Sequence, residues 1–596
     1  MMNALYDYAV RHELSLPDGY AKKTVAAYIS FSSKAEEYVG LHKGTEWAVA
    51  CPDMGNMAKG NKSNVIIDKR SNIFPETESE KSRFFLQTLS SFGEYDSDAL
   101  LCVHRLTTPQ VIQEIKRLLD EEKVKAENRI SFMVDGRKLH NSPHLLNWWL
   151  KWRNEIMPPN KGGLAPCLIT GELIIPVATT PTIKRIPDKG GKLGEGALIC
   201  FDKPAFTSYG LKQAANAPVS ESAMGAVKAA LDELLLDAPN LCGMKFVHWY
   251  DRDVKKEEDL FFDFNFLGID NVEQDDDEDN ELDECDIAHR EQGARSQANS
   301  MIESVHSGGT AGTLDAIYHI LLLSLVKGRV MVRRYELGEY KTLQKNLDDW
   351  NRDLALVPPH GKGANCKPKK LYHRLIRLLK YHKDQEMDKR KLYQRMNDEL
   401  SGIAPAILTS ILGGGVIPDA VAVRALNTIR SKMRLSDEKK YRNLDSTACQ
   451  WLKVWLLRNH ERSEEHLNEY YNPNHPEPAY HCGAVMAVYG EIQHKAMPEV
   501  NVNMAQRFYA SCIQTPALVL GRLSQMSVHH LAKIENKFYQ NLYRELLEQV
   551  HSAIGPVIPT TLSLEKQSYF ALGYYQMYAK MRQDRMDAVN KNKEEA

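Results

Sequence analysis

The feature that most restricts the fold is a long run of amphipathic helical patterns in the C-terminal third of the chain. Segments such as TACQWLKVWLLRNHER and SLEKQSYFALGYYQMYAKMRQDRM place apolar residues at helical spacing. Short breaks such as GPVIPTT separate these segments, and short connections favour antiparallel neighbouring helices. Residues 441–596 are therefore predicted to form an all-α helical bundle.

The N-terminal half carries a different pattern, in which short strand-like runs alternate with loops and helices. Lys23–Phe31 and Ser63–Lys69 are typical of strands, and a helical period starts at Pro109. Leu145–Ile156 is rich in aromatic residues and compatible with a helix. A chain of 596 residues is also too long for one hydrophobic core. We predict an α+β chain with an N-terminal mixed α/β domain over residues 1–340, ahead of a helical C-terminal part.

Two blocks of charge lie between these regions. Asp270–Asp286 contains eleven Asp or Glu and no Lys or Arg, which predicts a solvated loop or linker and leaves mimicry of a phosphate backbone as an alternative. Lys362–Arg395 contains twelve Lys or Arg against three Asp or Glu. A cationic helical segment of this density favours contact with phosphates. We therefore predict a basic helical middle region over residues 341–440.

Several classes of protein are disfavoured by composition. The N-terminal residues lack the pattern of a secretory signal, and the apolar run Ala316–Val326 is far shorter than the roughly 20 residues of a membrane span. The ten cysteines are scattered without a CxxC pair, which favours reduced thiols in a cytoplasmic protein. The sequence predicts no membrane contact, no metal site and no cofactor.

The stretch Phe201–Leu236 combines Ser, Tyr and Lys ahead of an amphipathic helix. Tyr209 and Lys212 are one residue too close for a Ser–Tyr–Lys dehydrogenase site, and no Gly-rich dinucleotide turn accompanies them. Pro218 favours an extended conformation of the preceding residue, and Ser220 is well placed as a helix N-cap. We predict a strand-to-helix junction without a catalytic role.

Other enzyme signatures are incomplete. The glycine-rich Asp188–Ala197 lacks the GK[ST] ending of a phosphate-cradling P-loop, so a plain turn or a loop that approaches a phosphate backbone remains open. His529 and His530 have no third ligand at metal-binding spacing. A nuclease or a nucleotide-dependent enzyme acting on DNA is kept as the alternative function.

The polar segment Met57–Asn72 combines cations with asparagines. Cations hold phosphates, and asparagine amides reach acceptors on base edges, although a polar surface hairpin explains the same composition. The candidate base-reading residues are Asn61, Asn64 and Asn72, and the candidate phosphate contacts are Lys59, Lys62, Lys69 and Arg70.

Several ordered blocks resemble one known family. CLITGE at Cys167–Glu172, then GALICFDKPAFTSYG and NAPVSESAMGAVKAALDELL, are similar to the central signature of the large subunit of the type I-C CRISPR Cascade. The opening ALYDYAVRHELSLPDGY and the closing LSLEKQSYFALGYYQMY agree in the same order, so the resemblance covers nearly the whole chain. LLLSLVKGRVMVRRYE lacks the Ser-Pro-Asn expected before its arginine strand, and the acidic block resembles an insertion.

The resemblance implies a non-catalytic, cytoplasmic subunit of an RNA-guided antiviral complex. Members recognise the protospacer-adjacent motif in duplex DNA, promote R-loop formation, hold the displaced strand and help recruit a separate helicase-nuclease. The implied partners are the guide RNA, target DNA, and the backbone, handle-capping and small subunits. The resemblance also implies that the C-terminal helical part is made alone as the small subunit. Met486 and Met497 are the candidate internal starts, and a non-Met start codon is the alternative.

Under this interpretation two further groups of cations become candidate DNA contacts. Guide pairing supplies long sequence specificity, so the protein reads only a short motif and holds backbones. Lys189 and Lys192 in the glycine-rich loop are candidates for duplex contact. The candidates for contact near the displaced strand are Lys369, Lys370, Arg374 and Arg377. The third hypothesis for the function of the chain is a helical scaffold that binds only protein.

Overall fold

The computed structural model describes most of the chain in two compact units. The described residues are 1–44, 48–55, 58, 60–77, 79–156, 163–188, 191–201, 203–207, 209–255, 258–263, 315–358, 370–380, 389–435, 445–460, 465–499 and 504–594. Unit 1 comprises the described residues of 1–184, 195–236 and 327–330, and unit 2 comprises those of 185–194, 237–326 and 331–596. The acidic block 270–286 lies outside the described residues. The predicted three-part division at residues 340 and 440 stays a prediction.

Unit 1 is built on a mixed sheet with the strand order β3-β2-β6-β5. The central strand β2 pairs in parallel with β6 and antiparallel with β3, and all five of its residues are buried. Such complete burial fits its sequence, AYISF, which is mostly apolar and does not alternate between polar and apolar residues. The strands of this sheet are β2 (Ala27–Phe31), β3 (Val39–Lys43), β5 (Asp68–Lys69), β6 (Arg129–Val134) and β7 (Arg137–Lys138).

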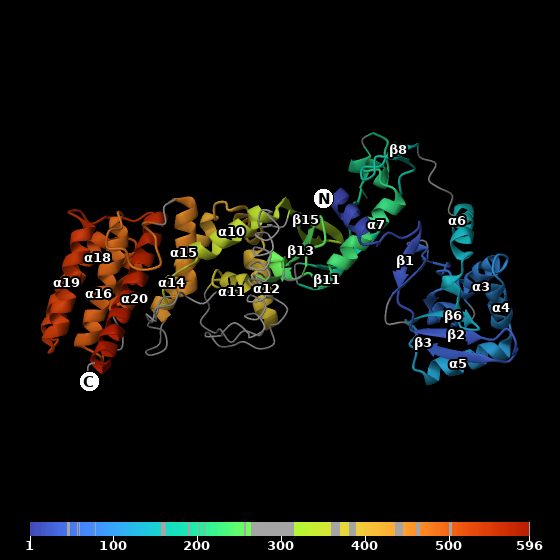
Figure 1. The fold of residues 1–596 in the computed structure, drawn as a ribbon, viewed down its shortest axis with the longest axis horizontal. Helices are drawn as coiled ribbons and strands as arrows, with labels where there is room; N and C mark the ends of the chain where they lie inside the picture. Colours follow the sequence, from blue (N-terminus) through green and yellow to red (C-terminus); the bar gives the residue numbers. More distant parts are fainter. Residues whose placement is uncertain are drawn as a thin grey trace, which may run out of the picture. The chain divides into compact units, whose positions relative to one another are not determined.

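Three helices pack around this sheet and contribute nine residues to its buried core (Figure 1). Phe85 on the first of them packs against Phe132 of β6, with ring centroids 6.0 Å apart. Each helix begins with a local signal: Ser79 forms a capping box, Asp96 accepts two backbone N–H bonds, and Pro109 occupies the first turn. The helices are α3 (Glu80–Gly93), α4 (Ser97–Leu106) and α5 (Pro109–Glu121).

The rest of unit 1 includes the predicted strand-to-helix junction. Ser220 Oγ accepts a hydrogen bond from Ala223 N at 3.1 Å, so Ser220 is the N-cap of α7, and Arg153 Nη2 bonds Glu221 at 2.6 Å. Helix α7 packs against α1. The elements are α1 (Met2–Arg11), β1 (Tyr20–Lys23), β4 (Val49–Pro52), α2 (Arg70–Ile73), α6 (Leu145–Ile156), β8 (Ala165–Pro166), β9 (Leu173–Ile174) and α7 (Glu221–Leu234).

A second sheet has most of its residues in unit 2. β13 pairs antiparallel with β14 over six consecutive residue pairs, Lys245↔Leu323 to Tyr250↔Tyr318. Phe246 and Leu322 belong to the same core cluster as the helices that follow. The strands of this sheet are β10 (Thr182–Pro187), β11 (Leu193–Ala197), β12 (Asn240–Leu241), β13 (Met244–Tyr250), β14 (Ile317–Val326) and β15 (Arg329–Glu339).

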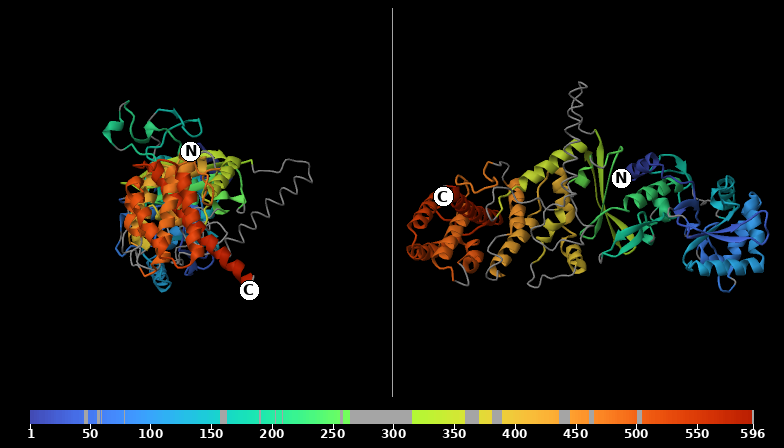
Figure 2. Two further views of the ribbon diagram at one scale, coloured as in Figure 1. Left: turned by 90° about the vertical axis from the view of Figure 1, so that its left-hand side faces the viewer. Right: turned by 60° about the horizontal axis from the view of Figure 1, so that its bottom comes forward.

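The described residues beyond β15 form helices and connections, as the helical periodicity predicted (Figures 1 and 2). The long helices α16 and α20 approach closely at two glycines. A Cβ added to Gly483 would lie 1.9 Å from Phe570 O, and one added to Gly573 would lie 1.9 Å from Tyr480 O. The helices are α8 (Leu260–Asp263), α10 (Tyr340–Asp353), α11 (Leu371–Ile376), α12 (Lys389–Leu400), α13 (Ala404–Gly413), α14 (Asp419–Leu435), α15 (Ser446–Asn459), α16 (Pro478–Ala496), α17 (Met504–Cys512), α18 (Pro516–Ala532), α19 (Lys537–Ile554) and α20 (Leu564–Glu594).

The predicted α+β class is therefore confirmed: strands and sheets lie in the N-terminal part, and a helical region follows. Within the described part of the chain, the longest and most apolar helices still fall short of what a membrane crossing requires.

Candidate nucleic-acid interface

The predicted motif-reading loop of unit 1 is anchored by the buried carboxylate of Asp68. Asp68 is 3% exposed, and its Oδ2 accepts a hydrogen bond from Asn64 N at 2.8 Å. Its Oδ1 accepts from Lys69 N at 2.7 Å and from Asn72 Nδ2 at 3.1 Å. One carboxylate thus fixes both the end of the loop and the first turn of α2.

Two of the three candidate asparagines take part in this anchoring. Asn64 Oδ1 accepts from Met54 N at 3.0 Å, which closes the loop across ten residues, and Asn72 is bonded to Asp68. Asn61 lies in a turn and is exposed, with half-buried Lys62 beside it. The structure therefore presents Asn61 and Lys62 at the loop surface and uses Asn64 and Asn72 to hold the loop.

The two described cations that follow the loop are ion-paired. Lys69 Nζ lies 2.5 Å from Glu127 Oε2, and Arg70 Nη2 lies 2.5 Å from Asp120 Oδ1. Arg70 also donates to Val124 O at 2.7 Å. A phosphate would have to compete with these carboxylates for either side chain. Their role as phosphate contacts stays a prediction.

The segment that joins the loop to β5 is strained. Ile66 has φ = 63°, a conformation that β-branched residues rarely adopt, and it is only 1% exposed. Ile67 N donates to Val65 O at 2.6 Å across a very tight turn, and Ser131 Oγ donates to Ile66 O at 3.1 Å. Strain of this kind persists where the surroundings over-determine the backbone, and it gathers at functional segments.

In unit 2, the glycine-rich loop is the turn of the β10–β11 hairpin. Asp188 Oδ1 accepts from Lys192 N at 2.9 Å, and Gly191 N donates to Asp188 O at 3.0 Å. A Cβ placed on Gly191 would lie 3.4 Å from Tyr393 Cε1 and 3.5 Å from Asn397 Nδ2, so the turn rests on α12. The first seven residues of α12 belong to the predicted basic segment, so the turn lies beside that segment, although none of the candidate contacts of the segment is on α12.

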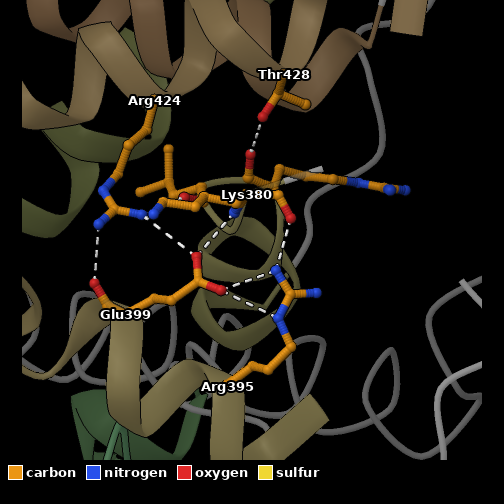
Figure 3. Close-up of polar contacts among 7 residues, drawn as sticks. Lys380, Arg395, Glu399, Arg424 and Thr428 are labelled. Carbon is orange, nitrogen blue, oxygen red and sulfur yellow. Dashed lines mark hydrogen bonds and ion pairs between the residues drawn. The ribbon is translucent and has the colours of Figure 1, made fainter. Parts of the chain in front are cut away.

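Glu399 of α12 links this helix to the residues after α11 and to α14 through hydrogen bonds and ion pairs (Figure 3). Its carboxylate accepts from Lys380 N at 2.8 Å and from Arg395 Nη2 at 2.8 Å, and it lies 3.7 Å from Arg424 Nη1. Burial alone would raise the pKa of Glu399, but the Lys380 N–H and the two guanidinium groups hold that pKa below its ordinary value. Arg424 Nη2 also donates to Glu399 O at 3.0 Å, and α11, α12 and α14 are thereby tied together.

With this geometry described, comparison with known proteins identifies the chain. The profile of a family described as CRISPR-associated protein (Cas_Csd1) matches residues 5–582. The chain belongs to this family. Membership across nearly the whole chain confirms the resemblance found in the sequence and is consistent with the large subunit of a type I-C Cascade. No curated protein matched the chain in a second comparison.

In this CRISPR-associated chain, the described candidates of the basic segment lie in α11 or cap its ends. Arg374 is 4% exposed and its Nη1 donates to Gln450 Oε1 at 2.8 Å in the core. Arg377 Nε lies 3.4 Å from Asp445 Oδ2, and Lys370 is the N-cap of α11. DNA contact by Arg374 would require this arginine to leave its core hydrogen bond. These roles stay predictions, as do those of Lys59, Lys189 and Lys369, which lie outside the described residues.

Sequence reasoning missed the residues that organise these loops. Asp68, Asn397 and Glu399 have no motif that marks them, because their importance depends on donors brought together by folding. Arg185 is a cation that the sequence analysis did not name. It is exposed on β10 with φ = 63°, and two residues separate it from the glycine-rich loop.

Proposed function

We propose that the chain is a non-catalytic subunit that reads the protospacer-adjacent motif of a Cascade complex in duplex DNA. It promotes R-loop formation, holds the displaced strand beside the guide RNA and helps recruit a separate helicase-nuclease. The backbone, handle-capping and small subunits of a cytoplasmic type I-C complex are its protein partners.

The observation that carries this proposal is the family membership over residues 5–582. The structure adds a loop suited to motif reading, because Asp68 fixes its base while Asn61 stays exposed. A short exposed amide and a neighbouring cation suit a protein that reads a few base edges and leaves the long sequence to guide pairing. Lys192 is exposed in the other candidate loop and supports contact with a backbone.

The first test changes the exposed tip of the loop. Asn61→Ala in the guide-loaded complex should reduce discrimination between duplexes with correct and altered flanking bases by about 1–3 kcal/mol. Binding titrations with the two duplexes measure this difference. Asn154→Ala, which alters an exposed asparagine on α6, is the matched control and should leave discrimination unchanged. If the Asn61 variant and the control discriminate equally between the two duplexes, Asn61 does not read the flanking bases.

The second test separates a phosphate contact from a base contact. Lys62→Ala should weaken binding to both duplexes by the same factor, because a phosphate carries no sequence information. It should also reduce the slope of log affinity against log salt by about 0.9, the value for one phosphate contact. A changed preference between the duplexes would contradict this assignment.

The rival enzyme hypothesis has its own test. The purified chain is incubated with labelled duplex and single-stranded DNA in the presence of Mg²⁺ or Mn²⁺. Under the proposal, the DNA stays intact while motif-dependent binding is retained in the complex. Metal-dependent cleavage that copurifies with the chain would favour the nuclease reading. Salt-independent or absent DNA binding would favour a scaffold that contacts only protein.

A further inference from the structure

A buried amide lies between two hairpin turns of unit 2 without a hydrogen-bond partner. Asn397 of α12 is 4% exposed, and neither its Oδ1 nor its Nδ2 has a partner among the described residues. A Cβ placed on Gly191 would lie 3.5 Å from Nδ2, and one placed on Gly243 would lie 3.3 Å from Cγ. Both glycines have positive φ, +77° and +80°. The amide thus faces the backbones of two turns.

The unpaired amide is costly in the free protein. A buried amide without a hydrogen-bond partner lowers the equilibrium constant for folding by a factor of about 5 to 150. An apolar side chain of similar size at this position would avoid that cost. The amide is therefore explained if it gains a partner in another state of the protein.

The glycine-rich loop offers a candidate hydrogen-bond partner for this amide. Gly191 N already donates to Asp188 O, whereas the Gly191 carbonyl accepts no hydrogen bond from the described residues. Lys192, the next residue, is exposed, and its N–H is held by Asp188. A small movement of this turn would shift Lys192 and the Gly191 carbonyl together.

We propose that Asn397 is a positioning residue for Lys192. When Lys192 contacts a DNA phosphate, the turn moves so that Asn397 Nδ2 donates to the Gly191 carbonyl, and the gain of this hydrogen bond strengthens DNA binding. This inference rests on the proposed function, because it assigns Lys192 a phosphate of the target duplex. It adds a residue of α12 that touches no DNA itself.

The test is a double-mutant cycle on the guide-loaded complex with target duplex. Asn397→Leu should lower duplex affinity about tenfold and reduce the salt slope by about 0.9, while the thermal unfolding midpoint stays equal or rises. Lys192→Ala should lower affinity and slope by similar amounts. The double variant should bind no more weakly than either single variant, because both act through one contact.

Gln576→Met is the matched control, since it removes a buried amide that does have partners. Gln576 accepts from Tyr480 and donates to Asn468, so its loss should lower the unfolding midpoint and leave duplex affinity unchanged. If Asn397→Leu does not assemble, Asn397→Ala replaces it in the cycle. Additive losses in the cycle, or wild-type affinity and slope in the Asn397 variant, overturn the inference. Absence of any chain-dependent duplex binding in the wild-type complex would instead overturn the proposed function.

Discussion

At individual residues, buried or half-buried carboxylates hold the segments on which the proposed function depends. Asp68, Glu399 and Asp445 are each surrounded by N–H donors or cations from several positions in the chain. Removing such an acceptor leaves the donors buried and unpaired, which costs more than the net value of the bonds. Substituting each carboxylate therefore has a predicted effect on protein stability, and this effect can be measured independently of DNA binding.

Asp68→Ala should destabilise unit 1 by about 2–3 kcal/mol. The change removes the acceptor for Asn64 N, Lys69 N and Asn72 Nδ2 at once. Chemical denaturation followed by a signal from unit 1 measures the loss. Glu127→Ala is the control: Glu127 is 74% exposed, and an exposed ion pair is worth about 1 kcal/mol or less. Equal effects of the two changes would contradict the anchoring role.

The ion pairs of Asp445 predict that the folded protein loses stability in acid. Burial alone would raise the pKa of Asp445, but Lys432 Nζ at 2.7 Å and Arg377 Nε at 3.4 Å hold it well below its ordinary value. Because the folded-state pKa is lower than the unfolded one, the stabilisation is complete above about pH 4 and is lost as the pH falls.

Asp445→Asn should therefore cost about 3 kcal/mol at pH 7 and flatten the stability curve below pH 4. The measurement is the free energy of unfolding between pH 7 and pH 2 for both proteins. Parallel curves for wild type and variant over this acidic range would show that Asp445 does not carry the sensitivity.

At the scale of elements, Glu399 makes α11, α12 and α14 one assembly. Glu399→Gln should destabilise the protein by about 1–2 kcal/mol, because the partly buried Arg395 and Arg424 lose their charged partner. Duplex affinity at low salt should stay equal or rise, since the change removes a negative charge beside cations. Unfolding and binding titrations measure the two effects. A fall in duplex affinity without a loss of stability would show that Glu399 does more than hold these helices together.

The elements also show what the sequence predicts and where it fails. Leu145–Ile156 was predicted as a helix and forms α6 with the same bounds, and Ser220 was predicted as an N-cap and caps α7, because both signals are local. Ser63–Lys69 was predicted as one strand, but only its last two residues form β5. Its apolar residues are buried as expected, yet the strained turn at Ile66 depends on tertiary contacts that no local pattern records.

The candidate site was predictable to a smaller extent than the fold. The basic segment and the glycine-rich loop were recognised from composition, but the contact of the loop with Tyr393 of that segment, and with Asn397 just beyond it, arises only from folding. Likewise, the asparagine pattern gave no means to separate exposed Asn61 from Asn64 and Asn72, which Asp68 holds. Residue type indicates the chemistry, whereas the available hydrogen-bond partners decide which side chains remain free to act.

At the scale of the whole molecule, family membership gives the chain its place among CRISPR-associated proteins. The central claim is that this chain reads the motif beside the target. The most direct measurement compares guide-loaded complexes assembled with and without the chain, using two duplexes that differ only in the bases flanking the protospacer. The account predicts that discrimination between the duplexes is present only when the chain is present. Unchanged discrimination after its removal would contradict the account, because the motif would then be read by another subunit.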